Sequence, residues 1–335
     1  MLLPLLSNTN PALKPRDSHG RSIGYLRLSL TRACQMRCTY CRPTFDRNES
    51  RDEITVDEIE SISRHLVQNF GVTKVRLTGG DPTARTDLLH IIKRLASIPG
   101  LNDLAMTTNG LTLATHAAAY RDAGLSRLNV SLDTLDPVTF AEMTGTNTCF
   151  RVLEGIRRAA GIFPGKLKLN TVVLRNQNLQ HLPDLLDFAV ELGVEIRFIE
   201  LMPMGPLAAN WEDRFVAETE MRQVLDARVD HWTMLPTTKE SARRFVATLH
   251  DGREATVGFI TPMSCNFCSN CDRLRIASDG AIYPCLMDAP SGNLLSAIRP
   301  AFSADRFDAA IAAAYADKRA EHPHDGVATM THIGG

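Results

Sequence analysis

Three cysteines lie close together in the stretch Cys34–Cys41, with the spacing C-x3-C-x2-C. They follow an alternating apolar segment, Tyr25–Leu30, which predicts a buried strand. Iron–sulfur cubes are held by cysteine thiolates, normally four of them. Three thiolates would leave one iron without a protein ligand, and an open position on a metal is where a small molecule can bind and react. A zinc site or a cluster used only for electron transfer are the alternatives at this point.

Predicted strands and helices alternate from residue 25 to residue 201. The strands are predicted at 25–30, 74–78, 103–107, 127–131, 166–173 and 195–201, with helices at 57–70, 87–97, 113–123, 150–161 and 179–192. Thr55 and Glu58 predict a capping box for the first helix, and Gly71 ends it. Strands joined by helical crossovers form a parallel sheet, and six are too few to close an eight-stranded barrel. We therefore expect an α/β fold, an open (β/α)6 partial barrel of the TIM type.

The alternation is confined to the middle of the chain, which predicts three regions. Residues 1–22 are expected to be an irregular arm, residues 23–205 the partial barrel, and residues 206–335 a C-terminal region across its open side. In that region the rhythm is lost from 202 to 262, and helices are expected near 218–227 and 304–319.

Charge and cysteine usage limit the function classes. The 37 Lys and Arg residues against 38 Asp and Glu residues argue against nucleic-acid binding through a basic surface. The eight cysteines are clustered and follow no convincing secretory signal, so we expect metal ligands in a reducing compartment, the cytoplasm. No run reaches about 18 apolar residues, so no membrane span is expected.

Glycine-rich or polar loops follow four predicted strands. They are Thr78–Pro82 (TGGDP), Thr107–Gly110 (TTNG), Asn129–Asp133 (NVSLD) and Arg197–Gly205 (RFIELMPMG). Ligands of parallel sheets bind beyond the carboxyl ends of the strands, so these loops should surround one site. Each loop alone would more often be an ordinary turn or cap.

A second cysteine group lies far downstream. It consists of Cys265, Cys268, Cys271 and Cys285. These four thiols permit a four-cysteine zinc site, and equally a second cube with three ligands and a spare cysteine. Cys149 is distant from both groups and is expected to be an ordinary buried thiol.

The first cysteine run, with Tyr40 before its last cysteine, and the four loops in this order resemble the radical S-adenosylmethionine (SAM) enzymes. The C-terminal pattern Cys268-x2-Cys271-x13-Cys285, an Arg-x-Arg pair after its second cysteine, and a final Gly-Gly resemble the GTP 3′,8-cyclase family of molybdenum cofactor (molybdopterin) biosynthesis. The resemblance covers roughly residues 20–335. It implies that a 5′-deoxyadenosyl radical removes hydrogen from C3′ of GTP, which leads to C3′–C8 cyclisation.

The resemblance also implies the sites. Two [4Fe–4S] clusters would be held by Cys34, Cys38 and Cys41 and by Cys268, Cys271 and Cys285, with Cys265 spare. SAM would contact Tyr40, Gly80, Ser131 and Met202. GTP would contact Arg27, Arg76, Thr107, Lys168, Arg273 and Arg275, and the terminal Gly334 and Gly335 would reach into the active site. A flavodoxin- or ferredoxin-like electron donor, a homodimer, and delivery of the product to cyclic pyranopterin monophosphate synthase are implied as well.

Two departures from the family pattern lie near the first cluster. Asp81 stands where the family has Glu, and Arg32-Ala33 stands where it commonly has Asp-Arg, which predicts a changed local ion pair. The alternatives that remain are a radical SAM maturase that modifies a peptide and a non-catalytic metal-binding protein. No G-x4-G-K-[ST] loop is present, which excludes a P-loop GTPase.

Overall fold

The computed structural model describes residues 16–41, 53–236, 240–323, 326 and 333. The first part of the chain alternates between short buried strands and amphipathic helices. Its elements are β1 (Tyr25–Ser29), α1 (Val56–Phe70), β2 (Lys74–Thr78), η2 (Pro82–Ala84), α2 (Leu88–Ala96), β3 (Asp103–Thr108), α3 (Leu113–Asp122), β4 (Arg127–Ser131), α4 (Pro137–Thr144), α5 (Cys149–Ile162), β5 (Leu167–Val173), η3 (Leu179–His181), α6 (Leu182–Leu192) and β6 (Glu195–Glu200). All six predicted strands are present, whereas α4 was not predicted.

The C-terminal part contains more strands than the sequence predicted. Its elements are η4 (Gly205–Asn210), α7 (Trp211–Arg214), α8 (Glu218–Leu225), β7 (Val229–Met234), β8 (Ala242–Leu249), β9 (Glu254–Ile260), η5 (Cys268–Asn270), β10 (Arg273–Ile276), β11 (Ala281–Tyr283), β12 (Gly292–Asn293), α9 (Leu295–Ile298) and α10 (Ala304–Ala316). The loss of rhythm expected at 202–262 was therefore wrong for the three strands from β7 to β9.

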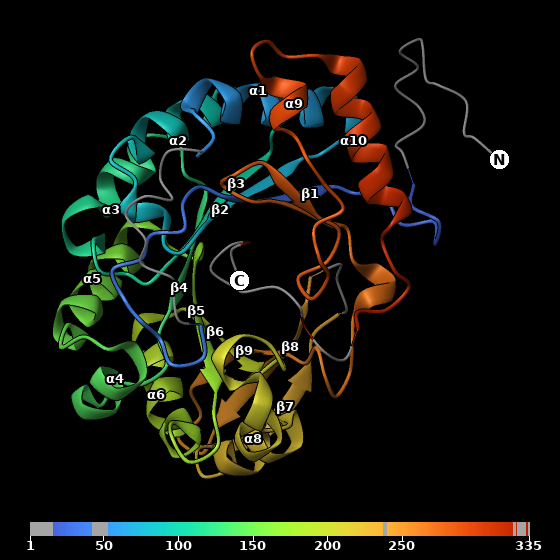
Figure 1. Ribbon diagram of the computed structural model, residues 1–335. Helices are drawn as coiled ribbons and strands as arrows, with labels where there is room; N and C mark the ends of the chain where they lie inside the picture. Colours follow the sequence, from blue (N-terminus) through green and yellow to red (C-terminus); the bar gives the residue numbers. More distant parts are fainter. Residues whose placement is uncertain (1–15, 42–52, 237–239, 324–325, 327–332, 334–335) are drawn as a thin grey trace.

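All described strands form one sheet, in the order β12-β11-β10-β1-β2-β3-β4-β5-β6-β9-β8-β7. The eight strands from β10 to β9 in this order are parallel, because β10 pairs with β1 and β9 with β6 in the parallel sense. These two outer strands are not neighbours of each other, so the barrel is open among the described strands. The expected partial barrel is confirmed, and the C-terminal region extends both of its edges. Helices α1 to α6 cover the outer side of the curved sheet (Figure 1).

Local signals explain where the helices begin and end. The predicted capping box is present, since the Thr55 side chain accepts from the Glu58 backbone and the Glu58 carboxylate accepts from Thr55 N at 2.7 Å. Gly71 follows α1 in the left-handed conformation, with φ 71°. The single helix predicted at 179–192 is divided into η3 and α6. Pro183 lies in the first turn of α6, where its missing N–H costs no helical hydrogen bond.

Aromatic packing joins the hairpin of β8 and β9 to the barrel. Phe259 on β9 is fully buried, and its ring lies 6.0 Å from that of Phe198 on β6 and 5.8 Å from that of Trp232 on β7. The Arg222 guanidinium lies over this group, 3.9 Å from the ring centroid of Phe245. No helix in the described part of the chain is both long enough and apolar enough to cross a membrane.

We predict that Phe259→Ala lowers the free energy of unfolding by about 3–5 kcal/mol, because it leaves a cavity where the hairpin meets the barrel. The control is Phe150→Ala, since Phe150 on α5 is 74% exposed and should cost less than about 0.5 kcal/mol. Denaturant unfolding of the full-length chain measures both. Equal losses for the two variants would mean that the hairpin contributes no core.

Candidate functional site

The first cysteine group lies directly after β1, at the carboxyl ends of the parallel strands. Cys34, Cys38 and Cys41 are all partly buried. Burial and the charge of Asp81 raise the pKa of Cys34 to about 11, while burial and the charges of Cys34 and Asp133 raise that of Cys41 to about 12. Burial and neighbouring negative charges raise the pKa of Cys38 as well. Such thiols become thiolates only when a bound cation offsets this cost. The donor set therefore fits three ligands to a shared metal cluster.

The Gly-Gly loop after β2 supports the cysteine loop through its backbone. The N–H of Gly80 donates to the Thr31 carbonyl at 2.7 Å, and the N–H of Asp81 donates to that of Ala33 at 2.8 Å. A Cβ added at Gly80 would overlap the carbonyl oxygens of Arg32 and Ala33. Glycine is required here because the two backbones touch.

The Asp81 carboxylate is fully buried and is bound by protein groups. It accepts hydrogen bonds from Thr83 N at 2.9 Å, from Thr108 Oγ1 at 2.9 Å and from Asn109 N at 2.6 Å. The Asn109 amide in turn donates to Gln35 at 2.9 Å. Burial raises the pKa of Asp81, although these hydrogen bonds oppose the shift. Asp81 therefore connects the loops after β2 and β3, and through Asn109 the cysteine loop.

The other departure from the family pattern, at Arg32, forms an ion pair. Arg32 Nη2 lies 2.5 Å from Asp279 Oδ2, in the turn between β10 and β11. Arg32, which lies just before the first cysteine group, thus pairs with a residue of the C-terminal region.

Of the four residues expected to contact SAM, Met202 lines a cavity on the inner side of the curved sheet. Tyr40 is buried, and its hydroxyl donates to Asp133 Oδ2 at 2.8 Å. Burial raises the pKa of Asp133 to about 6, while Tyr40 and a backbone N–H oppose the shift. Ser131 ends β4 opposite Asn170, and Gly80 packs against the cysteine loop.

This cavity, of about 430 Å³, lies inside the curved sheet. All six residues expected to contact GTP line it: Arg27, Arg76, Thr107, Lys168, Arg273 and Arg275. The sheet register places Arg27 between Arg76 on β2 and Arg275 on β10. Strands far apart in the sequence therefore bring their guanidinium groups together.

Charge inside this cavity shifts several pKa values. Burial, together with the charges of neighbouring arginines, lowers the pKa of Arg27 to about 9 and that of Arg275 to about 10. Burial alone would raise the pKa of Tyr25, but the charges of Arg76 and Arg27 lower it to about 7. Arg76 Nε donates to the Tyr25 hydroxyl at 2.5 Å. A polyanion in this space would relieve the repulsion among the guanidinium groups.

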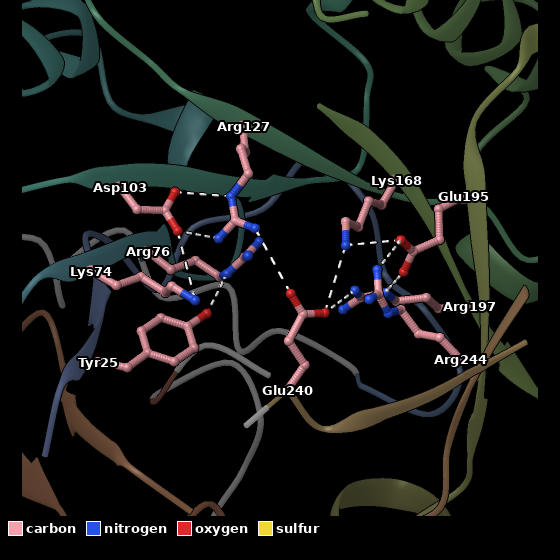
Figure 2. A network of polar contacts seen from close by, with 10 residues as sticks. All are labelled: Tyr25, Lys74, Arg76, Asp103, Arg127, Lys168, Glu195, Arg197, Glu240 and Arg244. Atoms are coloured by element: carbon pink, nitrogen blue, oxygen red, sulfur yellow. Dashed lines mark hydrogen bonds and ion pairs between the residues drawn. The ribbon is translucent and has the colours of Figure 1, made fainter. Parts of the chain in front are cut away.

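Further charged side chains lie at the amino ends of the same strands, and Figure 2 shows their network. Lys168 Nζ lies 2.9 Å from Glu195, while Arg127 Nε donates to Asp103 at 2.9 Å. Among the charged residues that line the cavity, the sequence analysis missed Lys74, Arg127, Arg197 and Glu240. The strand predictions already placed the three cations on the strands that became β2, β4 and β6, and strand alternation could have aimed them inward.

The second cysteine group lies beside this cavity. Cys268, Cys271 and Cys285 are partly buried, whereas Cys265 is exposed. Burial raises the pKa of Cys268, and the charges of Cys285 and Cys271 raise it further. Burial opposes ionisation of Cys271, but Lys318, whose Nζ lies 3.7 Å from the sulfur, and Arg273 lower its pKa. The donor set fits three ligands of a second cluster, with Cys265 apart.

A single-ion site is not formed by these groups. Within the described residues, no three His, Cys, Asp or Glu side chains converge closely enough to hold one metal ion. Cys149 is buried at the start of α5, as expected.

Part of the predicted N-terminal arm is docked against the second cysteine group. Arg21 is buried and pairs with Asp17 at 2.6 Å. Its guanidinium donates to the carbonyls of Cys268 at 2.8 Å and Arg319 at 2.6 Å. Residues 16–22 therefore position the loop that carries Cys268, a contact that the sequence analysis missed because an isolated arginine carries no such signal. Residues 1–15 lie outside the described part.

The predicted C-terminal tail is described only at two positions. Gly334 and Gly335 lie outside the described residues. Ile333 is fully buried and packs with Ala277, Ala281 and Tyr283, and Gly326 N donates to the Pro203 carbonyl at 3.2 Å.

Comparisons with known proteins agree with this arrangement. Residues 28–189 match the radical SAM superfamily, and residues 194–324 match the Molybdenum Cofactor Synthesis C family. The GTP 3′,8-cyclase of Alkaliphilus metalliredigens is 37% identical over 85% of this chain and 87% of its own length. GTP 3′,8-cyclase 1 of Pseudomonas aeruginosa is 40% identical over 84% of this chain and 85% of its own length. The GTP 3′,8-cyclase of Rhizobium etli is 37% identical over 98% of this chain and 92% of its own length.

Among solved structures, Streptococcus suis SuiB with bound S-adenosylmethionine is similar in fold. The TM-score is 0.60 at 16% identity, covering 82% of this chain and 64% of SuiB. At this identity the similarity concerns the fold alone.

We predict that Gly80→Ala loses the iron of the first cluster, because the added methyl group displaces the backbone of the cysteine loop. Gly161→Ala is the matched control, since no atom lies within 4 Å of a Cβ added there on α5. Iron analysis after anaerobic reconstitution measures both. Full iron content in Gly80→Ala would show that the loop tolerates the displacement.

We also predict that Arg21→Met loses the second cluster and keeps the first, so that iron falls from about eight to about four per chain. The reason is the loss of the guanidinium that holds the Cys268 carbonyl. Arg16→Met, at an exposed position nearby, should keep all the iron. Iron analysis combined with a SAM-cleavage assay separates the two clusters, and unchanged iron in Arg21→Met would contradict the positioning role.

Proposed function

Because the chain belongs to the GTP 3′,8-cyclase family within the radical SAM superfamily, we propose that it converts GTP into (8S)-3′,8-cyclo-7,8-dihydroguanosine 5′-triphosphate, the first step of molybdopterin biosynthesis. One observation carries this proposal on the structural side. A cavity of about 430 Å³ gathers eight lysine and arginine side chains and reaches Met202 on one side and Arg273, beside the second cysteine group, on the other.

The cofactors are two [4Fe–4S] clusters and SAM. We assign Cys34, Cys38 and Cys41 to the first cluster and Cys268, Cys271 and Cys285 to the second, and Cys265 to neither. When bound, the reduced first cluster and SAM supply the 5′-deoxyadenosyl radical that removes the hydrogen from C3′ of the ribose. The protein contributes binding, orientation and the exclusion of water.

The cationic residues of the cavity are assigned to GTP. Arg27, Arg76 and Lys168 hold the triphosphate, because guanidinium groups bind phosphate oxygens through paired hydrogen bonds. Thr107, which accepts from Arg76 at 3.2 Å, joins them. Arg273 and Arg275 lie beside the second cysteine group, where the guanine is oriented. This arrangement fixes the ribose between base and phosphates, which brings C3′ towards C8.

The SAM contacts are assigned to the loops after the strands. Met202 borders the cavity, and Gly80 and Ser131 lie at the carboxyl ends of β2 and β4. Since the Tyr40 hydroxyl is engaged by Asp133, Tyr40 offers SAM its backbone. The terminal Gly334 and Gly335 are assigned to the completion of the site during cyclisation.

The remaining partners are proposals from the family alone. A flavodoxin- or ferredoxin-like protein donates the electron, cyclic pyranopterin monophosphate synthase receives the product, and the enzyme is a homodimer. Eight free cysteines suit the reducing cytoplasm. We divide the chain into an arm at 1–22, a radical SAM barrel at 23–205 and a C-terminal region at 206–335. A peptide-modifying maturase is supported only by similarity of fold.

The decisive experiment incubates the anaerobically reconstituted protein with GTP, SAM and dithionite. The expected products are 5′-deoxyadenosine and a cyclised nucleotide that degrades to a pterin. Cleavage of SAM without any GTP-derived product would overturn the proposal.

We predict that Cys34→Ala abolishes SAM cleavage, whereas Cys268→Ala retains part of it and loses cyclisation. Each variant should hold about four irons per chain, compared with about eight in the wild type. Cys265→Ala is the control and should keep both clusters and both activities. If Cys34→Ala and Cys268→Ala behave alike, the two clusters do not have separate roles.

A further inference from the structure

One carboxylate of the cavity, that of Glu240, lies among the cations Arg127, Lys168 and Arg197, of which the proposed function assigns Lys168 to the triphosphate. We propose that Glu240 holds the place of the terminal phosphate: its carboxylate binds these cations until the phosphate displaces it. This inference rests on the proposed function and adds to it a residue that determines specificity.

Glu240 contacts cations from three neighbouring strands. Its Oε2 atom pairs with Arg197 on β6 and lies 3.6 Å from Lys168 Nζ on β5, while Oε1 lies 4.0 Å from Arg127 Nη1 on β4. Figure 2 shows the carboxylate between Arg127 on one side and the other two cations on the other. A phosphate group with its several oxygens could make the same set of contacts.

Glu240 differs from the other carboxylates of this network in its access to the cavity. Glu195 and Asp103 are the first residues of β6 and β3, and neither lines the cavity. Glu240 precedes β8, lines the cavity, and its side chain is 27% exposed. It can therefore leave the cations without any change in the sheet, whereas Glu195 and Asp103 are themselves residues of strands in the sheet.

The order of strands in the sheet indicates which phosphate reaches this place. Arg273 and Arg275, assigned to the base, lie on β10, next to β1. Arg127, Lys168 and Arg197 lie on β4, β5 and β6, which β1, β2 and β3 separate from β10 along the sheet. A nucleotide anchored by its base at β10 extends towards β4–β6 with its phosphate chain. The terminal phosphate reaches Glu240, and the single phosphate of GMP does not.

A resident carboxylate stabilises the cavity before the substrate binds. Burial and the Arg197 charge lower the pKa of Lys168, which shows that the cations repel one another. Burial opposes ionisation of Glu240, but Arg197 and Lys168 lower its pKa to about 2, so it is charged at neutral pH. A small free anion is not anchored to the protein by a nucleotide base, so it lacks the binding energy to displace the Glu240 carboxylate. Glu240 thus favours a long, anchored polyphosphate.

The test measures equilibrium binding of GTP, inorganic tripolyphosphate and GMP to the anaerobically reconstituted full-length protein, without turnover. In Glu240→Gln we expect GTP and tripolyphosphate to bind about tenfold more tightly, because the phosphate no longer has to displace the partly exposed ion pairs of Glu240. The affinity for GMP should change less than about twofold. Equal tightening of GTP and GMP, or unchanged binding of all three, would overturn the inference.

Glu195→Gln is the matched control, because it removes a carboxylate from the same two cations at a place outside the cavity. We expect it to leave GTP binding unchanged or weaker, since Lys168 and Arg197 lose the group that orients them. If it tightens GTP binding as much as Glu240→Gln does, the effect is one of net charge and the inference fails. A wild-type protein that binds tripolyphosphate but not GTP would instead contradict the proposed function.

Discussion

Positive charge enclosed by a parallel sheet is the constraint on which this structure depends. Among the residues that the structure describes, eight lysine and arginine side chains and three carboxylates line the cavity. Enclosing so many like charges is costly unless partners offset them. The protein supplies such partners itself: the Tyr25 phenol accepts from Arg76, Asp103 pairs with Arg127, and Glu195 and Glu240 pair with Lys168 and Arg197. The remaining excess positive charge makes the interior selective for a polyanion.

The two ends of the same strands carry different chemistry. The first cysteine loop and the loops after β2, β3 and β4 lie at the carboxyl ends, where ligands of parallel sheets usually bind. The ion pairs of Asp103, Arg127, Lys168 and Glu195 lie at the amino ends. The cavity between them can hold one nucleotide with its ribose close to a radical source and its phosphates away from it. Such a separation keeps a reactive intermediate from the charged groups that only anchor the substrate.

Hydrogen bonds between described residues hold the cluster-binding loops in place. Asp81 accepts hydrogen bonds from Thr83, Thr108 and Asn109, and Gly80 brings the loop after β2 directly against the backbone of Arg32 and Ala33, just before the cysteines. Arg21, near the N-terminus, likewise holds the loop that carries Cys268, because its guanidinium donates to the Cys268 carbonyl. The two departures from the family pattern fit this scheme, since Asp81 binds protein groups and Arg32 gains Asp279 as a partner. Loops whose conformations are fixed by these contacts can present their thiolates in one arrangement.

Much of this protein follows from local signals in the chain. The cysteine spacings, the capping box at Thr55 and the period of the apolar residues predicted the clusters, the first helix and six parallel strands, because each depends on residues a few positions apart. The pairing of β10 with β1 and of β9 with β6 joins strands that local periodicity does not connect. That pairing decided how the barrel is extended, which cations share the cavity, and that Glu240 lies among them. Sequence alone thus determined the chemistry that the chain carries, and the tertiary structure decided which charges meet, since long-range pairing depends on the packing of the whole sheet.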